Sequence, residues 1–324
     1  MPNILTHALM ANDVLQDLQA IDLKGIILKY PQVFSMATSG PDFLFYYKAL
    51  PMQDATLGKP IHDLGNTVHT KNINAFYQNA INIIKSSDDN EILIAYLAGH
   101  LMHWSLDVTA HPYVFNRSGE IGGKTKYWHY RFESMIDTIM VRQIKGYRLD
   151  ATRTFDCVQS KAEDRERLAA FYREIVSRTH QEDVSTDIYA ESMESMYTLA
   201  KWLFDPHTLK FPVIQGIERM MDLDWKYSSH MVIGELDVKH DILNLNHKPW
   251  MHPVTGDVSI KSFLDLYHEA ILLGQAVLYR LNDILYQGKQ TTLDDLIRDR
   301  SYDTGLKDAG AMRFYASVYE YENL

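Results

Sequence analysis

Three side chains of the kind that binds metals recur at a regular spacing within one apolar stretch. His103, Asp107 and His111 lie four residues apart in a segment that is otherwise almost entirely apolar from residue 91. On a helix this spacing places all three on one face, one turn from each other. Burying imidazoles and a carboxylate together is costly unless something neutralises them, and a metal ion does so. A buried, hydrogen-bonded His–Asp pair is the other interpretation, which is preferred for a single pair and disfavoured for the triple.

His129 and Glu133 repeat the same spacing a short distance downstream. Two such side chains on one helix face can chelate a single metal ion. An exposed His–Glu pair is the more common explanation of this pattern alone. Its position just after the first cluster favours a metal site.

Three further candidates lie upstream, and each also has an ordinary structural explanation. His7 falls on the apolar side of the first predicted helix, Asp42 follows the turn at Gly40, and His62 follows the turn residues Gly58 and Pro60. A core histidine, a turn carboxylate and a histidine in a surface loop account for them if they are taken one at a time.

Composition narrows the chemistry of any metal site. The 324 residues include 14 His, 42 Asp and Glu, 32 Lys and Arg, and a single cysteine, Cys157. One cysteine excludes internal disulfides and Cys-based zinc clusters, so a metal must be held by imidazole and carboxylate, a set that suits zinc and other first-row ions. The formal net charge of −10 and the lack of a basic run make the chain poorly suited to nucleic acid.

The elements that must position these residues are helices. Apolar residues recur at helical spacing, and no alternating strand pattern is present. We predict helices over residues 7–18, 73–84, 91–110, 128–145, 162–177, 188–204, 214–221, 262–286 and from 294 onward. Thr6 is the expected cap of the first helix, and Pro112 is expected to end the buried one. Residues 244–259 are expected to form a long loop.

These patterns predict an all-α chain with a single domain over residues 1–324, because no Pro/Gly/Ser-rich linker divides it. The metal-site motifs fall within residues 1–137, and a helical C-terminal part covers 160–324. The N-terminus shows no basic segment followed by an apolar one, and the apolar stretch 92–106 is too short and too polar to span a membrane. A cytoplasmic location is therefore expected.

Several short motifs together resemble one known family. They are Asn3-Ile4-Leu5-Thr6-His7, Gly40-Pro41-Asp42-Phe43-Leu44-Phe45-Tyr46-Tyr47-Lys48, Ile61-His62-Asp63, Gly99 to Tyr113, and His129-x3-Glu133. Their order is similar to that in zinc-dependent phospholipase C proteins, and the soluble bacterial branch of that family is the nearest likeness. Residues 243–250 and 262–267 resemble the C-terminal part of the same branch. The resemblance implies the all-α fold and the trinuclear zinc site of the phospholipase C/P1 nuclease type.

The resemblance also implies which residues would hold two to three zinc ions. The first ion would be held by Asp42, His62, His103 and Asp107, the second by His111, His129 and Glu133, and the third by His7 with Asp107 as a bridge. His69 is the alternative to His62, and His100 is expected to support the ligands through hydrogen bonds. The third ion would also use the N-terminal amine, which becomes that of Pro2 if Met1 is removed.

The implied chemistry is phosphodiester hydrolysis. A hydroxide bridging two metal ions would attack the phosphorus of a phospholipid or related phosphodiester, with Asp42 as a ligand that also orients the water or accepts its proton. The aromatic stretch 43–47 would face lipid or fill the core. His247, Lys248 and Trp250 would contact substrate or belong to a solvated loop. Transient contact with a membrane surface is compatible with such an enzyme.

Three alternatives stay open at this point. The first is a nuclease or nucleotidase on the same fold. The second is an HD-type metallophosphohydrolase, suggested by the His62-Asp63 dipeptide but not by the four-residue spacings. The third is a metal-stabilised binding protein without catalytic activity.

Overall fold

The computed structural model describes residues 4–50, 52–88, 90–122, 126–223, 225–307 and 310–319, and these are mainly helical, as predicted. The helices of the first half are α1 (Ile4–Asp17), α2 (Ile21–Lys29), α3 (Pro31–Ala37), α4 (Lys59–Thr70), α5 (Ile73–Lys85), α6 (Glu91–Ser118) and α7 (Lys126–Ile139). Those of the second half are α8 (Thr154–Cys157), α9 (Ala162–His180), α10 (Thr186–Leu203), α11 (Phe211–Met220), α12 (Phe263–Tyr286) and α13 (Asp294–Ile297). The prediction of one domain for residues 1–324 stays a prediction.

Shorter elements connect these helices. The 3-10 helices are η1 (Gly40–Tyr46), η2 (Ala55–Gly58), η5 (Leu149–Ala151) and η6 (Ser228–His230), and a π-helical turn, η4 (Met140–Ile144), extends α7. The two-residue strands β1 (Phe204–Asp205) and β2 (Val232–Ile233) pair in parallel. Strands β3 (Trp250–Met251) and β4 (Val258–Ser259) pair antiparallel within the predicted long loop.

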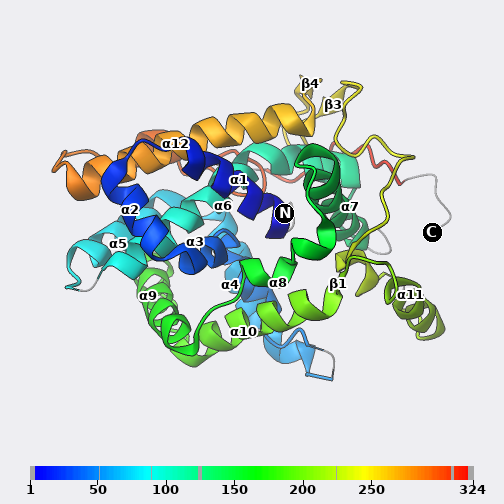
Figure 1. The fold of residues 1–324 in the computed structure, drawn as a ribbon, viewed down its shortest axis with the longest axis horizontal. Helices are drawn as coiled ribbons and strands as arrows, with labels where there is room; N and C mark the ends of the chain where they lie inside the picture. Colours follow the sequence, from blue (N-terminus) through cyan, green and yellow to red (C-terminus); the bar gives the residue numbers. More distant parts are fainter. Residues whose placement is uncertain are drawn as a thin grey trace.

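Helix α6 runs through the centre of the molecule. All of its residues except Glu91, Thr109 and Arg117 are buried, which agrees with a sequence that is apolar on nearly every side. The long helix α12 packs along it and also covers α1, while α3, α7 and α9 contact it from other directions (Figure 1). A helix enclosed in this way gives its polar side chains a dry and rigid setting.

Two predicted boundaries of helices are wrong. Thr6 lies inside α1 and does not cap it; the backbone N–H groups of Leu5 and Thr6 donate instead to the carboxylate of Asp137 on α7, at 3.0 and 2.8 Å. Pro112 does not end α6, which continues to Ser118. The enclosure of α6 outweighs the one helical hydrogen bond that a proline cannot donate.

The predicted C-terminal helix is also wrong beyond its first turn. Helix α13 ends at Ile297, because Arg298 and Asp299 each adopt a φ of 55°, a left-handed conformation that terminates helices. The described residues that follow, 299–307 and 310–319, contain no helix. This extended segment returns to the centre of the molecule and reaches α6.

No described helix is both long enough and apolar enough to cross a membrane.

Candidate metal centre

The centre of the site is the carboxylate of Asp107, which is fully buried on α6. One turn before it, His103 Nε2 approaches Asp107 Oδ2 to 2.9 Å. One turn after it, His111 Nδ1 lies 3.8 Å from the same oxygen. The four-residue spacing therefore places the three side chains along one helix face, as predicted.

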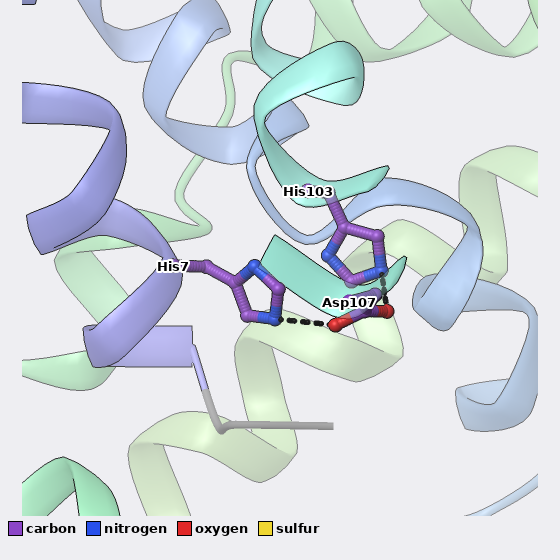
Figure 2. Close-up of side chains that lie close together, drawn as sticks. All are labelled: His7, His103 and Asp107. Carbon is purple, nitrogen blue, oxygen red and sulfur yellow. Dashed lines mark ion pairs between the residues drawn. The ribbon is translucent and has the colours of Figure 1, made fainter. Parts of the chain in front are cut away.

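His7 reaches this carboxylate from a different helix. Its Nε2 lies 3.2 Å from Asp107 Oδ1, and its ring stacks on that of His103 with 4.3 Å between the ring centres. Figure 2 shows His7 on α1 and His103 on α6 contacting different oxygens of Asp107. A carboxylate that offers one oxygen to each of two histidines has the arrangement of a bridging ligand. Candidate ligand atoms of His7, His103 and Asp107 lie within 4.8 Å of one another.

A second group of donors shares His103 with the first. Asp42, in η1, places Oδ1 3.0 Å from His69 Nε2 and 3.7 Å from His103 Nε2. One glycine makes this approach feasible: Gly40 has a φ of +51°, and a Cβ on it would lie 2.1 Å from the His103 ring. Only glycine fits there, so the Gly40-Pro41 turn sets Asp42 against the histidines.

His69 rather than His62 completes this second group. Candidate ligand atoms of Asp42, His69 and His103 lie within 4.8 Å of one another, and His62 is not among them. His62 Nε2 donates instead to the Tyr47 carbonyl at 3.0 Å. Both histidines lie on α4, where the sequence suggested a loop around His62. The structure therefore brings the stated alternative, His69, and not His62, beside Asp42 and His103.

The third group lies where α6 meets α7. His129 Nε2 is 2.8 Å from Glu133 Oε1 on the same helix, and His111 Nε2 from α6 is 3.8 Å from that oxygen. Candidate ligand atoms of these three buried residues lie within 4.8 Å of one another. This trio is the set that the sequence assigned to one metal.

Backbone carbonyls hold the histidine rings in fixed orientations. The Nδ1–H groups of three of them donate to carbonyls: His69 to Gly65 at 2.7 Å, His103 to Thr38 at 3.0 Å, and His111 to Tyr302 at 2.9 Å. Because a carbonyl only accepts, each ring carries its proton on Nδ1 when neutral and directs an Nε2 lone pair toward the centre. Such outer hydrogen bonds are typical of histidines that bind metals.

The sequence model of the zinc-dependent phospholipase C family matches residues 6–191. This range is more than half of the chain and contains all the donors described above. The chain belongs to the zinc-dependent phospholipase C family. The members of this family are phosphodiester hydrolases, and the chain is an enzyme of that class. No curated protein and no solved structure matches the chain.

The unsatisfied hydrogen-bonding capacity of these donors fits zinc. Several buried atoms make no hydrogen bond within the described part of the chain: both His7 nitrogens, His103 Nε2, both Asp107 oxygens and His111 Nε2. Orphaned polar atoms in a core are costly, and metal ions would satisfy them together. Imidazole nitrogen and carboxylate oxygen are the donors that zinc takes in the absence of thiolates.

The protonation states also suit metal binding. Burial alone would raise the pKa of Asp107, but the surrounding histidines, His103 first, bring this pKa well below its usual value. Burial lowers the pKa of His111 and of His129 well below 6.5. An ionised carboxylate and neutral imidazoles are the forms that bind metal.

His69 and His103 differ from the other histidines. Burial lowers the pKa of each, but the hydrogen bond to Asp42 and its charge outweigh burial for His69, and the charges of Asp107 and Asp42 outweigh it for His103, so both pKa values are raised. Protons therefore compete with metal more strongly at this pair than at His111 and His129.

The other predicted residues lie outside the donor groups. His100 bonds through Nδ1 to the Tyr77 hydroxyl at 3.0 Å, which agrees with its expected supporting role. His247 is exposed and donates to the Ile260 carbonyl, while Trp250 is buried against Tyr113 and donates to the Lys261 carbonyl. Lys248 joins the same loop through its backbone. Pro2 lies outside the described residues.

Sequence reasoning missed the C-terminal contribution entirely. Tyr302 supplies the carbonyl that orients His111, although it lies 191 residues further along the chain. A backbone carbonyl that accepts a hydrogen bond cannot be recognised from the type of its side chain. Only the prediction of an extended segment, in place of the predicted helix, would have indicated this contact.

Proposed function

We propose that this enzyme hydrolyses a phospholipid between the glycerol and the phosphate, with zinc held by the three donor groups. The observation that carries the proposal is the Asp107 carboxylate, placed between His7 and His103 in a continuous set of buried donors. The family supplies the class of reaction and the kind of ester. Two to three ions per chain are proposed because there are three donor groups, two of which share His103.

The metal ions, when bound, would supply a water of lowered pKa and would offset the charge that develops on the phosphate oxygens. His7, His103 and Asp107 would hold them at the buried end. His111, His129 and Glu133 would hold them at the other end. Since the pKa shifts favour ionised Asp107 and neutral His111 and His129, this chain needs little proton loss there before it binds metal.

Asp42 is proposed to orient the attacking water and accept its proton. Its side chain is about 10% exposed, more than that of any other proposed donor, so solvent and substrate reach it first. Oδ1 is engaged by His69, and Oδ2 makes no hydrogen bond among the residues that the structure describes. A carboxylate with one oxygen fixed and the other available is suited to position water.

The aromatic stretch near Asp42 divides into two parts. Phe43 is buried and packs edge-on against Tyr172 at 4.9 Å, so it belongs to the core. Phe45, Tyr46 and Tyr47 are only half-buried. Burial of the phenol and the nearby Asp42 raise the pKa of Tyr46. These three rings are the proposed contacts for the glycerol side of the substrate.

Headgroup release from vesicles tests the proposal. The zinc-loaded chain is incubated with phosphatidylcholine vesicles, with a chelator, and with chelator followed by zinc. Diacylglycerol and phosphocholine are expected to form only when zinc is present. Cleavage of single-stranded DNA without cleavage of lipid would instead support the nuclease alternative. Bound zinc without turnover of either substrate would support a non-catalytic role.

A further inference from the structure

A C-terminal segment beyond the region matched by the family lies directly against the metal centre. Residues 300–305, here termed the strap, run along α6 beside the donor face. The Arg300 carbonyl accepts from Trp104 Nε1 at 3.1 Å, next to His103. The Tyr302 carbonyl accepts from His111 Nδ1. The strap therefore contacts α6 at both ends of the metal-binding face.

The third contact is made at a carbonyl of α6 that lacks its usual helical donor. Pro112 has no N–H, so the Val108 carbonyl four residues earlier lacks its helical donor. Gly305 fits against this carbonyl: its φ is +66°, and a Cβ on it would lie 2.4 Å from the Val108 oxygen. Close packing at this point requires glycine. Val108 follows Asp107, so the strap is seated one residue from the central carboxylate.

Tyr302 is the most connected residue of the strap. Its backbone N–H donates to the His69 carbonyl at 2.9 Å, while its carbonyl orients His111. Its buried ring lies 5.2 Å from the His69 ring and 5.8 Å from the His103 ring. Its hydroxyl bonds to that of Tyr77 at 2.8 Å, and Tyr77 in turn bonds His100. One residue thus contacts histidines of two donor groups and orients one of a third.

We propose that the strap preorganises the metal centre and that Tyr302 is its positioning residue. The inference rests on the zinc site of the proposed function. A histidine binds metal well when its other nitrogen is fixed, because the ring orientation and tautomer are then set in advance. Tyr302 fixes His111 through Nδ1, and its ring limits the movement of His69 and His103. The C-terminal part of the chain thereby becomes part of the catalytic apparatus.

A matched pair of glycine substitutions separates strap seating from backbone strain. Gly305 and Gly288 both have left-handed backbones, with φ of +66° and +61°. A Cβ at Gly305 meets the Val108 carbonyl, whereas nothing lies within 4 Å of one at Gly288. Gly305→Ala therefore lifts the strap from α6, while Gly288→Ala introduces a similar backbone strain far from this contact.

Zinc binding and thermal unfolding of metal-free protein are measured for both variants and the wild type. We expect Gly305→Ala to weaken zinc binding about 10-fold to 100-fold, the range for losing an outer partner of a metal ligand. Gly288→Ala is expected to bind zinc like the wild type. Equal affinities for Gly305→Ala and the wild type, or equal losses in both variants, would overturn the proposal.

A second pair of substitutions, both at Tyr302, tests the proposed role of the strap even if Gly305→Ala does not fold. Tyr302→Phe keeps the ring and the backbone contacts, whereas Tyr302→Ala removes the ring. With cobalt in place of zinc, the absorption bands report ligand geometry directly. We expect Tyr302→Phe to retain the wild-type spectrum and affinity, and Tyr302→Ala to lose both. An unchanged spectrum in Tyr302→Ala overturns the positioning role. Failure of the wild type to bind zinc or cobalt would refute the proposed function instead.

Discussion

The two ends of the metal centre are assembled in different ways. At the Glu133 end, three donors come from two neighbouring helices, α6 and α7. At the Asp107 end, donors converge from α1, η1, α4 and α6, and two groups share His103. The first end needs one helix–helix contact, whereas the second needs four elements to be in place. The residue common to both groups, His103, therefore links donors from four elements that are far apart in the sequence.

The histidines differ between the two ends as well. Burial leaves His111 and His129, near Glu133, with lowered pKa values. At the Asp107 end burial likewise lowers the pKa of His7, whereas interactions with Asp107 and Asp42 raise the pKa values of His103 and His69. The Asp107 end is thus more dependent on its carboxylates. The largest effects of substitution are expected there.

Asp107→Asn should remove at least two metal ions and nearly all activity. The amide is neutral, and one of its two bridging oxygens is replaced by a group that cannot bind metal. Zinc content per chain is measured by elemental analysis. Asp205→Asn is the matched control, because Asp205 is also buried and accepts three backbone N–H groups, at the start of α11. Wild-type zinc content in Asp107→Asn would contradict the bridging assignment.

Glu133→Gln should release a single ion and leave the Asp107 end loaded. Only the trio of His111, His129 and Glu133 loses a charged donor, and its histidines belong to no other group. The expected result is one zinc fewer per chain, with activity strongly reduced. Glu218→Gln provides the control, since this buried carboxylate accepts from Ser228 and belongs to none of the donor groups. Loss of all zinc would show that the two ends do not load independently.

His69→Asn should weaken zinc binding well beyond the effect of His62→Asn. The first substitution removes an imidazole that faces Asp42 and His103, and the second removes one that donates to a loop carbonyl. We expect at least a 10-fold loss of affinity at one ion for His69→Asn and almost no change for His62→Asn. Competition with a zinc-binding dye measures both. The reverse ranking would restore His62 as the ligand.

His62 and His69 also show what residue spacing alone cannot decide. The spacings at His103, Asp107 and His111 and at His129 and Glu133 lie within single helices, so local periodicity suffices to group them. His62 and His69 are seven residues apart, which is two turns of one helix, and spacing cannot decide which of them meets a distant turn.

The same distinction between local patterns and distant contacts applies to the fold. Helical periodicity predicts the all-α class and the buried α6, because these features depend on local patterns. The path after α13 depends on two left-handed residues and on a fit between Gly305 and Val108. The acceptor that orients His111 is a backbone carbonyl, which every residue carries. Such features depend on tertiary packing and cannot be predicted from composition or residue spacing.

Asp137 connects the two ends of the centre, and it carries the smallest expected effect on metal binding. It lies on α7, one turn after Glu133, and its carboxylate accepts from Leu5 and Thr6 at the start of the helix that carries His7. Asp137→Ala leaves these buried donors unsatisfied and should cost about 1–3 kcal/mol of unfolding free energy. The affinity for zinc should fall modestly, and first at the end of the centre that contains His7.

The protonation of Asp137 offers a further check on this link. Burial raises its pKa from 3.8 to about 7. A raised pKa in the folded state means that folding favours the proton, so this contribution to stability is full below about pH 4 and is lost as pH rises through 7. Urea unfolding of metal-free wild type and Asp137→Asn between pH 5 and 8 measures it. The stability of the wild type relative to the variant should fall with rising pH, whereas a constant difference would show that the buried carboxyl does not titrate in this range.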